Sequence, residues 1–302
     1  MSITNTTEQK HGYILVNGIR MHYVTAGDGP LLLMLHGFPE FWYSWRHQIP
    51  ALAAHFTVVA PDQRGYNETD KPDWGYDTDV LANDMVQLID RLGFSTAHVV
   101  GHDWGGAISW YLGMNYAHRV ERLAVLNCPH PKLFLRNLRR NPKQLRRSWY
   151  MGFFNLPALP EAAISANDFA LIDEVFRGHA LNKAAFSDED LHAYKEALRR
   201  PGALTAALNW YRAAAAGGPE SIVGPGDGKV TAPTLLIWGE QDRFLGRELT
   251  YGTEKYVPDL TIRYIPNSSH WVQHEFPDDV NQHLRDFFVQ QSGVNGQASA
   301  AS

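Results

Sequence analysis

Cysteine is nearly absent from this chain of 302 residues, in which Cys128 is the single cysteine. One cysteine excludes an internal disulfide and favours a reducing compartment, so we expect a cytoplasmic location. The first ten residues, MSITNTTEQK, lack the apolar stretch of a secretory signal. No window contains 18 consecutive apolar residues, so we expect no membrane-spanning helix.

An excess of basic charge is also missing, because 27 Lys and Arg residues against 32 Asp and Glu residues give a net charge of −5. A nucleic-acid-binding protein needs a basic face, so this balance argues against that class. Basic residues do cluster in Lys132–Arg147. We interpret that run as a solvated helix face rather than an anion-binding surface.

Motifs for metals and nucleotides are lacking too. The sequence contains no HExxH, no clustered Cys and His ligands, and no GxxxxGK loop followed by Ser or Thr. We therefore predict neither a metal nor another cofactor. The sequence has no internal repeat, and no feature of it predicts an oligomeric state.

Short apolar runs that alternate with amphipathic stretches are what the sequence does contain. Hydrophobic residues make up 44% of the chain and charged residues 20%, which is typical of a globular protein. Unbroken apolar runs indicate strands that are buried on both faces, as in a parallel sheet covered by helices. The expected strands are Leu31–Leu35, Thr57–Ala60, Ala97–Val100 and Leu123–Leu126, and the expected helices between them are Ser44–His55, Thr78–Leu92 and Trp104–Tyr116.

This alternation stops after Cys128 and returns at Ala232–Trp238 and Leu260–Ile265. The intervening residues 132–231 contain helical and loop-like segments without a convincing buried strand. We therefore predict an α/β core made of residues 1–131 and 232–302, with a helical insert at 132–231. The small and polar tail Gly293–Ser302 is expected to be frayed.

The sequence GHDWGG at residues 101–106 follows an apolar strand and opens a helix. Small residues on both sides of a central Asp103 fit a nucleophile elbow, in which the backbone turns sharply and presents one side chain at the end of a strand. The alternative interpretation is a helix N-cap Asp followed by glycines needed for packing.

Two further side chains follow later strands and complete a candidate triad. Asp242 lies in GEQD after one apolar strand, and His270 lies in SSHW after the next. The order nucleophile, acid, base is that of the α/β-hydrolases, although each residue alone could be an ordinary loop residue. The HGFP segment after the first parallel strand adds the backbone N–H of Phe38, which could form an oxyanion hole with the N–H of Trp104.

An Asp in place of Ser changes the chemistry that this site can perform. A carboxylate, with an ordinary pKa of about 3.9, is already ionised at neutral pH and can attack an electrophilic carbon to form an ester. His270 would then activate the water that hydrolyses the ester, and Asp242 would orient His270. Such a site suits epoxides and alkyl halides. Asp103 at the elbow excludes a serine esterase, unless a different serine is the nucleophile.

The chain resembles an epoxide hydrolase of the α/β-hydrolase superfamily over about residues 12–290. The similar segments are HGFPEFWYSWR, DQRGYNETDKP, GHDWGG, ALNWYR and SHWVQHE. The resemblance implies a mostly parallel sheet flanked by helices, an inserted helical cap and a cis bond between Phe38 and Pro39. It also implies that two cap tyrosines, Tyr150 and Tyr211, bind the epoxide oxygen of a small apolar substrate, which becomes a vicinal diol after Asp103 opens the ring and water hydrolyses the ester. The predicted pocket walls are Phe38, Pro39, Trp104, Phe153, Phe154 and Trp271.

Other members of this superfamily provide alternatives. Haloalkane dehalogenases share the Asp-Trp pair, but many have Asn as a halide ligand where this chain has Phe38. Fluoroacetate dehalogenases usually have Arg after the nucleophile, where this chain has Trp104. A non-catalytic ligand receptor on the same fold is a third alternative, because fold alone does not decide function.

Overall fold

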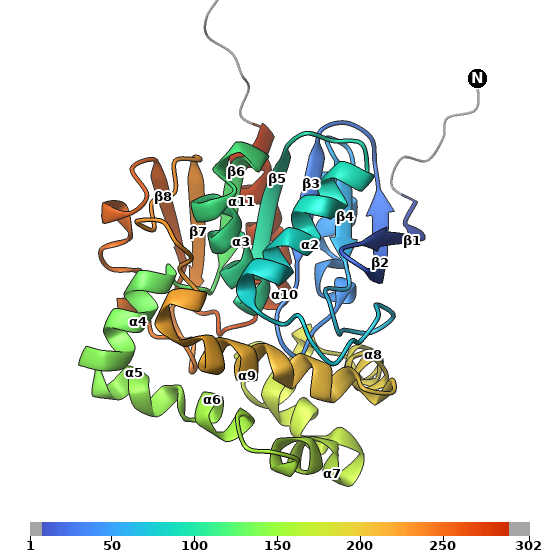
Figure 1. The fold of residues 1–302 in the computed structure, drawn as a ribbon, viewed down its shortest axis with the longest axis vertical. Helices are drawn as coiled ribbons and strands as arrows, with labels where there is room; N and C mark the ends of the chain where they lie inside the picture. Colours follow the sequence, from blue (N-terminus) through green and yellow to red (C-terminus); the bar gives the residue numbers. More distant parts are fainter. Residues whose placement is uncertain (1–7, 290–302) are drawn as a thin grey trace, which may run out of the picture.

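The computed structural model describes residues 8–289, so the predicted frayed tail Gly293–Ser302 lies outside the described residues. An eight-stranded sheet runs through the molecule in the order β1-β2-β4-β3-β5-β6-β7-β8 (Figure 1). β1 and β2 pair antiparallel, β2 pairs antiparallel with β4, and all remaining pairs are parallel. The strands are β1 Lys10–Val16, β2 Ile19–Ala26, β3 Leu31–Leu35, β4 Thr57–Pro61, β5 Ala97–His102, β6 Val120–Leu126, β7 Thr234–Gly239 and β8 Leu260–Ile265.

Helices cover both faces of this sheet, which explains why β3 and β5 are buried at every position. Leu33 and Leu35 belong to the same core cluster as the buried residues of α2 and α3. Leu32 and Met34, which point to the opposite face, pack with α1 and α11. The flanking helices are α1 Gln48–Leu52, α2 Thr78–Arg91, α3 Asp103–Asn115, α10 Val272–Glu275 and α11 Pro277–Val289. The predicted mostly parallel α/β sheet flanked by helices is confirmed.

The single helix expected at Ser44–His55 is a wrong prediction. The structure has a 3₁₀ turn at Trp42–Trp45 and then only the five-residue α1. Pro50 lies inside this segment and lacks the N–H that would bond to the carbonyl group of Arg46. The apolar spacing was helical, but proline prevents one continuous helix.

Six helices between β6 and β7 lie together below the sheet in Figure 1, and we call them the helical insert. They cover the carboxyl ends of the parallel strands, because residues of α4, α6 and α9 line a cavity together with Asp103 at the end of β5. The helices of the insert are α4 Pro131–Arg140, α5 Pro142–Arg147, α6 Trp149–Phe154, α7 Leu159–Asp173, α8 Asp188–Arg199 and α9 Ala203–Ser221.

Shorter helical turns connect the main elements. They are 3₁₀ turns at Ala117–Arg119, Lys183–Ala185, Arg247–Thr250 and Thr253–Lys255, and a π turn at Glu174–Gly178. Across residues 8–289, none of the helices has both the length and the apolar character needed to cross a membrane.

Candidate active site

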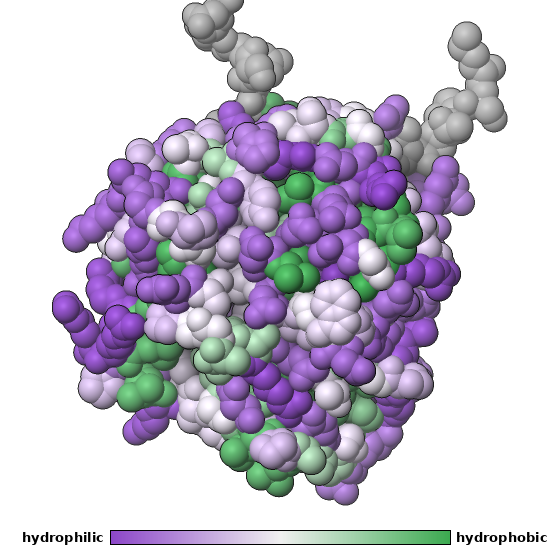
Figure 2. All heavy atoms as spheres, viewed as in Figure 1, coloured by the Kyte–Doolittle hydropathy of each residue, from purple (hydrophilic) through white to green (hydrophobic). Residues whose placement is uncertain are grey.

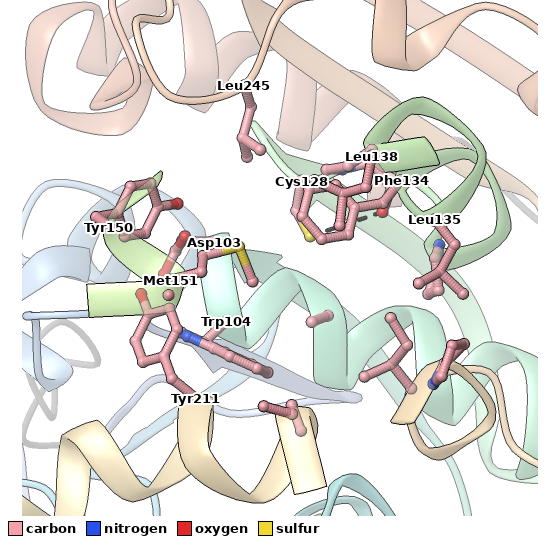
Figure 3. A pocket seen from close by; sticks show the side chains of 18 of the residues that line it. Asp103, Trp104, Cys128, Phe134, Leu135, Leu138, Tyr150, Met151, Tyr211 and Leu245 are labelled. Atoms are coloured by element: carbon pink, nitrogen blue, oxygen red, sulfur yellow. Dashed lines mark hydrogen bonds between the residues drawn. The ribbon is translucent and has the colours of Figure 1, made fainter. Parts of the chain in front are cut away.

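Asp103 stands at the sharp turn between β5 and α3. Its backbone φ is +51°, a left-handed conformation that is uncommon for residues with a Cβ. Gly105 permits the turn, because a Cβ there would lie only 2.0 Å from the carbonyl oxygen of Leu35. The strained turn directs the carboxylate of Asp103 into the cavity under the helical insert (Figure 3).

His270 lies between two carboxylates. Its Nδ1 is 2.7 Å from Oδ2 of Asp242, and its Nε2 is 3.6 Å from Oδ2 of Asp103. Asp242 follows β7 and His270 follows β8, so adjacent strand ends bring together side chains that are far apart in sequence. This is the spatial arrangement that a nucleophile, base and orienting acid require.

Electrostatics favour an ion pair in the resting site. Burial lowers the pKa of His270, but the carboxylates of Asp242 and Asp103 outweigh burial and raise that pKa to about 10. Burial also opposes ionisation of Asp103, yet the neighbouring His270 holds the pKa of Asp103 below its ordinary value. At neutral pH the site therefore contains an Asp103 carboxylate beside an imidazolium.

One of the two oxyanion-hole candidates contacts the Asp103 carboxylate directly. The backbone N–H of Phe38 donates to Oδ1 of Asp103 at 2.9 Å. Trp104 is the second residue of α3, so its N–H has no partner within the helix. The peptide bond between Phe38 and Pro39 is cis, as the resemblance implies. The N–H of Phe38 therefore contacts the carboxyl group on which an ester would form, and the N–H of Trp104, the next residue after Asp103, is free of helical hydrogen bonding.

Two tyrosines from the helical insert enter the cavity opposite this scaffold. Tyr150 comes from α6 and Tyr211 from α9, and their ring centroids are 6.2 Å apart. Burial, reinforced by the negative charge of Asp103, raises the pKa of both hydroxyls well above the ordinary value. Both hydroxyls are therefore neutral hydrogen-bond donors at physiological pH.

The cavity beside Asp103 has a volume of about 420 Å³, within the usual range for small-molecule sites. Of the six predicted wall residues, Trp104 lines it and the other five do not. The Phe38 ring packs behind the tyrosines, at 5.5 Å from Tyr211 and 5.4 Å from Phe154. The residues outside the lining are Phe38, Pro39, Phe153, Phe154 and Trp271.

The wall is instead formed by residues of four helices, α3, α4, α6 and α9, and of the loops beside them. Trp271 is buried and packs against Phe176 at 4.6 Å, which removes its ring from the cavity. Sequence patterns did not reveal which faces of α4 and α9 turn inward. The main apolar lining comprises Ala107, Cys128, Pro129, Pro131, Phe134, Leu135, Leu138, Met151, Ala214, Ala215, Pro219, Ile222 and Leu245.

Comparison with known proteins agrees with this geometry. The family described as "alpha/beta hydrolase fold" matches residues 30–277. The chain belongs to the α/β-hydrolase fold family. Human epoxide hydrolase 4 is 39% identical over 293 residues, which cover 93% of this chain and 80% of that protein. The AB hydrolase superfamily protein YfhM of Bacillus subtilis is 42% identical, over 92% of this chain and 98% of that protein.

Solved structures place the chain among the epoxide hydrolases of this family. The epoxide hydrolase of Bacillus megaterium in complex with an inhibitor is 34% identical and superposes with a TM-score of 0.86. The match covers 92% of this chain and 100% of that one. A variant of the same enzyme, solved with a diol product that carries a naphthyloxy group, gives a TM-score of 0.84 at the same identity and coverage.

One residue that sequence reasoning missed in this α/β-hydrolase is Asn127, at the end of β6. Its Nδ2 donates to Oδ2 of Asp242 at 2.8 Å, the same oxygen that faces His270. Its Oδ1 accepts a hydrogen bond from the N–H of Gly239 at 2.9 Å. Asn127 therefore ties the end of β6 to the acid of the candidate triad. The only sequence signal was its place directly after an apolar strand.

Glu40 is a second residue to which the sequence assigned no role. Its buried carboxylate contacts Nδ1 of His102 at 2.8 Å and Nε2 of His274 at 3.0 Å. Burial opposes the charge of Glu40, but the two histidines hold its pKa well below the ordinary value. The Nε2 of His102 in turn contacts the backbone oxygen of His270 at 2.9 Å. This network braces the loop that carries His270.

Acidic and metal-binding side chains do not gather elsewhere to suggest a second centre. Within residues 8–289, no group of three or more His, Cys, Asp or Glu side chains is arranged to hold a metal ion. The free Cys128 is buried and lines the cavity.

Proposed function

We propose that this epoxide hydrolase family member opens small apolar epoxides to vicinal diols through a covalent ester on Asp103. One observation carries the proposal: an ionised carboxylate and two neutral tyrosine hydroxyls line the same apolar cavity. A nucleophile on one side and acidic donors on the other match the two needs of an epoxide, which must be attacked at carbon and protonated at oxygen.

In the first step, Asp103 attacks a ring carbon and the carbon–oxygen bond of the epoxide breaks. The departing oxygen takes a proton from Tyr150 or Tyr211, and the resulting tyrosinate recovers a proton from the imidazolium of His270. The products of this step are a hydroxyalkyl ester of Asp103, neutral tyrosines and a neutral His270.

Ester formation itself prepares His270 for the second step. The Asp103 carboxylate is one of the groups that raise the pKa of His270 to about 10 in the resting site. The ester is uncharged, so this contribution disappears and the pKa of His270 falls. Neutral His270 can then remove a proton from water.

The water oxygen attacks the carboxyl carbon of Asp103, and the N–H groups of Phe38 and Trp104 stabilise the oxyanion. Collapse of this intermediate breaks the ester bond, and the diol oxygen takes the proton from His270. The new carboxyl group of Asp103 then passes its proton to His270, which restores the resting ion pair. Asp242, 2.7 Å from Nδ1 of His270, holds the ring in place throughout.

A hydrolytic dehalogenase remains the second candidate, because it would use the same Asp103 and His270. Phe38 offers no side-chain donor to a halide, and both tyrosine hydroxyls suit an oxygen leaving group better. Halide release from 1-bromobutane or fluoroacetate, without diol formation from epoxides, would favour the dehalogenase. A receptor would bind such ligands without converting them.

The decisive experiment is a single turnover of styrene oxide in ¹⁸O-labelled water, with enzyme in excess. We expect unlabelled diol and one ¹⁸O atom in the peptide that contains Asp103, because water attacks the carboxyl carbon. Label in the diol with an unlabelled peptide would overturn the covalent route. The His270→Gln variant should accumulate the alkylated Asp103 peptide, which mass spectrometry detects as a mass increase equal to styrene oxide.

A further inference from the structure

The first three helices of the helical insert differ from the rest of the molecule in charge. Residues 131–160, which include α4, α5 and α6, contain seven of the 27 basic residues of the chain and no acidic residue. All 32 acidic residues therefore lie elsewhere, together with the remaining 20 basic residues. Positive charge is concentrated on one part of a chain whose net charge is −5.

Most of this positive charge is not neutralised locally. Lys132 and Arg136 donate to backbone oxygens, and the hollow on their side of α4 contains one carboxylate, that of Glu220, against four cationic side chains. Arg147 lies 3.8 Å from a carboxylate oxygen of Glu248. The other four basic side chains are exposed and form neither an ion pair nor a hydrogen bond within residues 8–289: Arg139, Arg140, Lys143 and Arg146. These four charges are therefore available to an anionic partner.

Large apolar side chains are exposed in the same part of the insert. Of the eleven exposed large hydrophobic side chains in residues 8–289, four lie between positions 145 and 159: Leu145, Trp149, Leu156 and Leu159. Figure 2 shows hydrophobic atoms over α5 at the lower left and over the connection between α6 and α7 at the bottom, beside strongly hydrophilic ones. This concentration favours an interaction surface over the solvated helix face that the basic run alone indicated.

Helix α5 shows that basic and apolar side chains share one outward face. Its inward side is fixed by Gln144, which is buried and donates to Oγ of the buried Ser148 at 3.0 Å and to a backbone oxygen after β7 at 2.8 Å. Gln144 and Ser148 are four positions apart and lie on the same side of the helix. Arg146, two positions from both, therefore points away from the core, and the exposed Leu145 and Trp149 lie beside it.

We propose that this surface, which we call the docking face, binds an anionic lipid bilayer. The basic side chains contact lipid phosphates, and the apolar ones enter the boundary between headgroups and acyl chains. A nucleic acid or an acidic polypeptide would match the charge but not the exposed tryptophan and leucine, whereas a bilayer matches both. The docking face comprises Arg139, Arg140, Lys143, Leu145, Arg146 and Trp149. Since α4 and α6 also line the catalytic cavity, docking holds that cavity close to a phase in which apolar compounds dissolve.

The first test is co-sedimentation with vesicles of phosphatidylcholine alone and of equal parts phosphatidylcholine and phosphatidylglycerol. We expect binding to the anionic vesicles only, and we expect added salt to weaken it. The Lys143→Gln/Arg146→Gln double variant should bind these vesicles roughly tenfold or more weakly. The matched control is Lys10→Gln/Arg91→Gln, which removes the same charge from exposed residues of β1 and α2 and should bind like the unchanged enzyme.

The second test asks whether Trp149 enters the bilayer. Anionic vesicles with brominated acyl chains should quench tryptophan fluorescence of the unchanged enzyme, and Trp149→Phe should remove most of this quenching. Trp74→Phe is the matched control, because Trp74 is 69% exposed, against 68% for Trp149, but lies outside the insert. The inference is overturned by absence of binding to anionic vesicles, by equal effects of both double variants, or by quenching that Trp149→Phe leaves unchanged. Binding of soluble polyglutamate without any quenching by vesicles would assign the docking face to an acidic protein instead.

Discussion

The two sides of the cavity differ in how their functional groups are held. On the sheet side, Asp242 accepts hydrogen bonds from Asn127, from the ring of His270 and from the backbone N–H groups of Phe244 and Leu245, all at 2.7–2.9 Å. On the insert side, the surroundings of the tyrosines are mainly aromatic rings. Tyr211, for example, packs edge-on against Trp104 with ring centroids 5.0 Å apart.

The two sides of the cavity therefore differ in how rigidly they hold their side chains. Asp103, Asp242 and His270 follow the ends of strands, where hydrogen bonds to neighbouring strand ends and loops hold their side chains in position. The tyrosines and the apolar wall lie on helices that pack through side chains, where size and shape can change without disturbing the triad. We therefore expect substitutions on the sheet side to alter chemical steps and substitutions on the insert side to alter substrate choice as well.

The largest expected effect comes from removing the charge of Asp103. The Asp103→Asn variant keeps the shape of the side chain but should lose about 10⁴-fold or more in turnover, because the nucleophile is gone. It also resembles the uncharged ester, so the pKa of His270 should fall from about 10. A ¹⁵N NMR titration of His270 in both proteins measures this fall, and an unchanged pKa would contradict the proposed switch.

The same ion pair predicts a direction for stability against pH. The pKa of His270 in the folded chain, about 10, lies above the ordinary value of about 6.5. Its contribution to the free energy of unfolding is therefore fully present below pH 6.5 and is lost as pH rises towards 10. Chemical denaturation at several pH values measures the free energy of unfolding. Over this range, that free energy should fall less for Asp103→Asn than for the unchanged enzyme.

The second largest effect should come from the tyrosines. Tyr211→Phe and Tyr150→Phe each remove one donor to the departing oxygen and should slow ester formation on the order of 10²-fold. Pre-steady-state alkylation of Asp103 measures this step directly. Tyr76→Phe is a control, since its hydroxyl donates to the carbonyl of Pro72 away from the cavity. Full alkylation rates in both cavity variants would contradict their assigned role.

The sequence predicted the sheet side more completely than the insert side. Apolar runs that end at sharp turns identify the strands. The carboxyl ends of parallel strands lie at one edge of the sheet, and this rule predicted that Asp103, Asp242 and His270 are close together. Pocket walls depend on how helices rotate and pack, which no local pattern encodes. Phe153 and Trp271 therefore lie outside the lining, while Phe134 and Leu135 line it.

Asn127 shows another limit of sequence reasoning. A single Asn after a strand belongs to no recognisable motif, and its role depends on Asp242, which lies 115 positions away in sequence. Its role becomes visible only when β6 and β7 are adjacent in the sheet. Sequence patterns find residues with characteristic neighbours along the chain, whereas residues that support them from a different strand need the fold.

A smaller effect than that of the tyrosines is expected at Asn127. Asn127→Ala removes one of the four hydrogen bonds to the side chain of Asp242 and should lower kcat roughly tenfold, which corresponds to about 1.4 kcal/mol. KM should stay unchanged, since Asn127 does not line the cavity. Steady-state kinetics and the pH profile of kcat measure this effect. Asn281→Ala, at another buried Asn that donates to the backbone of His47, is the control. A change in KM alone would contradict a positioning role.

The smallest effect is expected from a substitution of Cys128. It tests whether the charge of a side chain, and not only its place in the cavity lining, decides which residue is the nucleophile. Cys128 lines the same cavity as Asp103, but burial and the neighbouring Asp103 carboxylate raise the pKa of its thiol well above the ordinary value. The thiol therefore stays protonated and unreactive near neutral pH, and Cys128→Ser should change turnover by no more than about twofold. Iodoacetamide should inactivate the unchanged enzyme and this variant equally slowly. Rapid inactivation that the substitution abolishes would mean that the thiol is ionised, and the charge distribution inferred for the whole cavity would then be wrong.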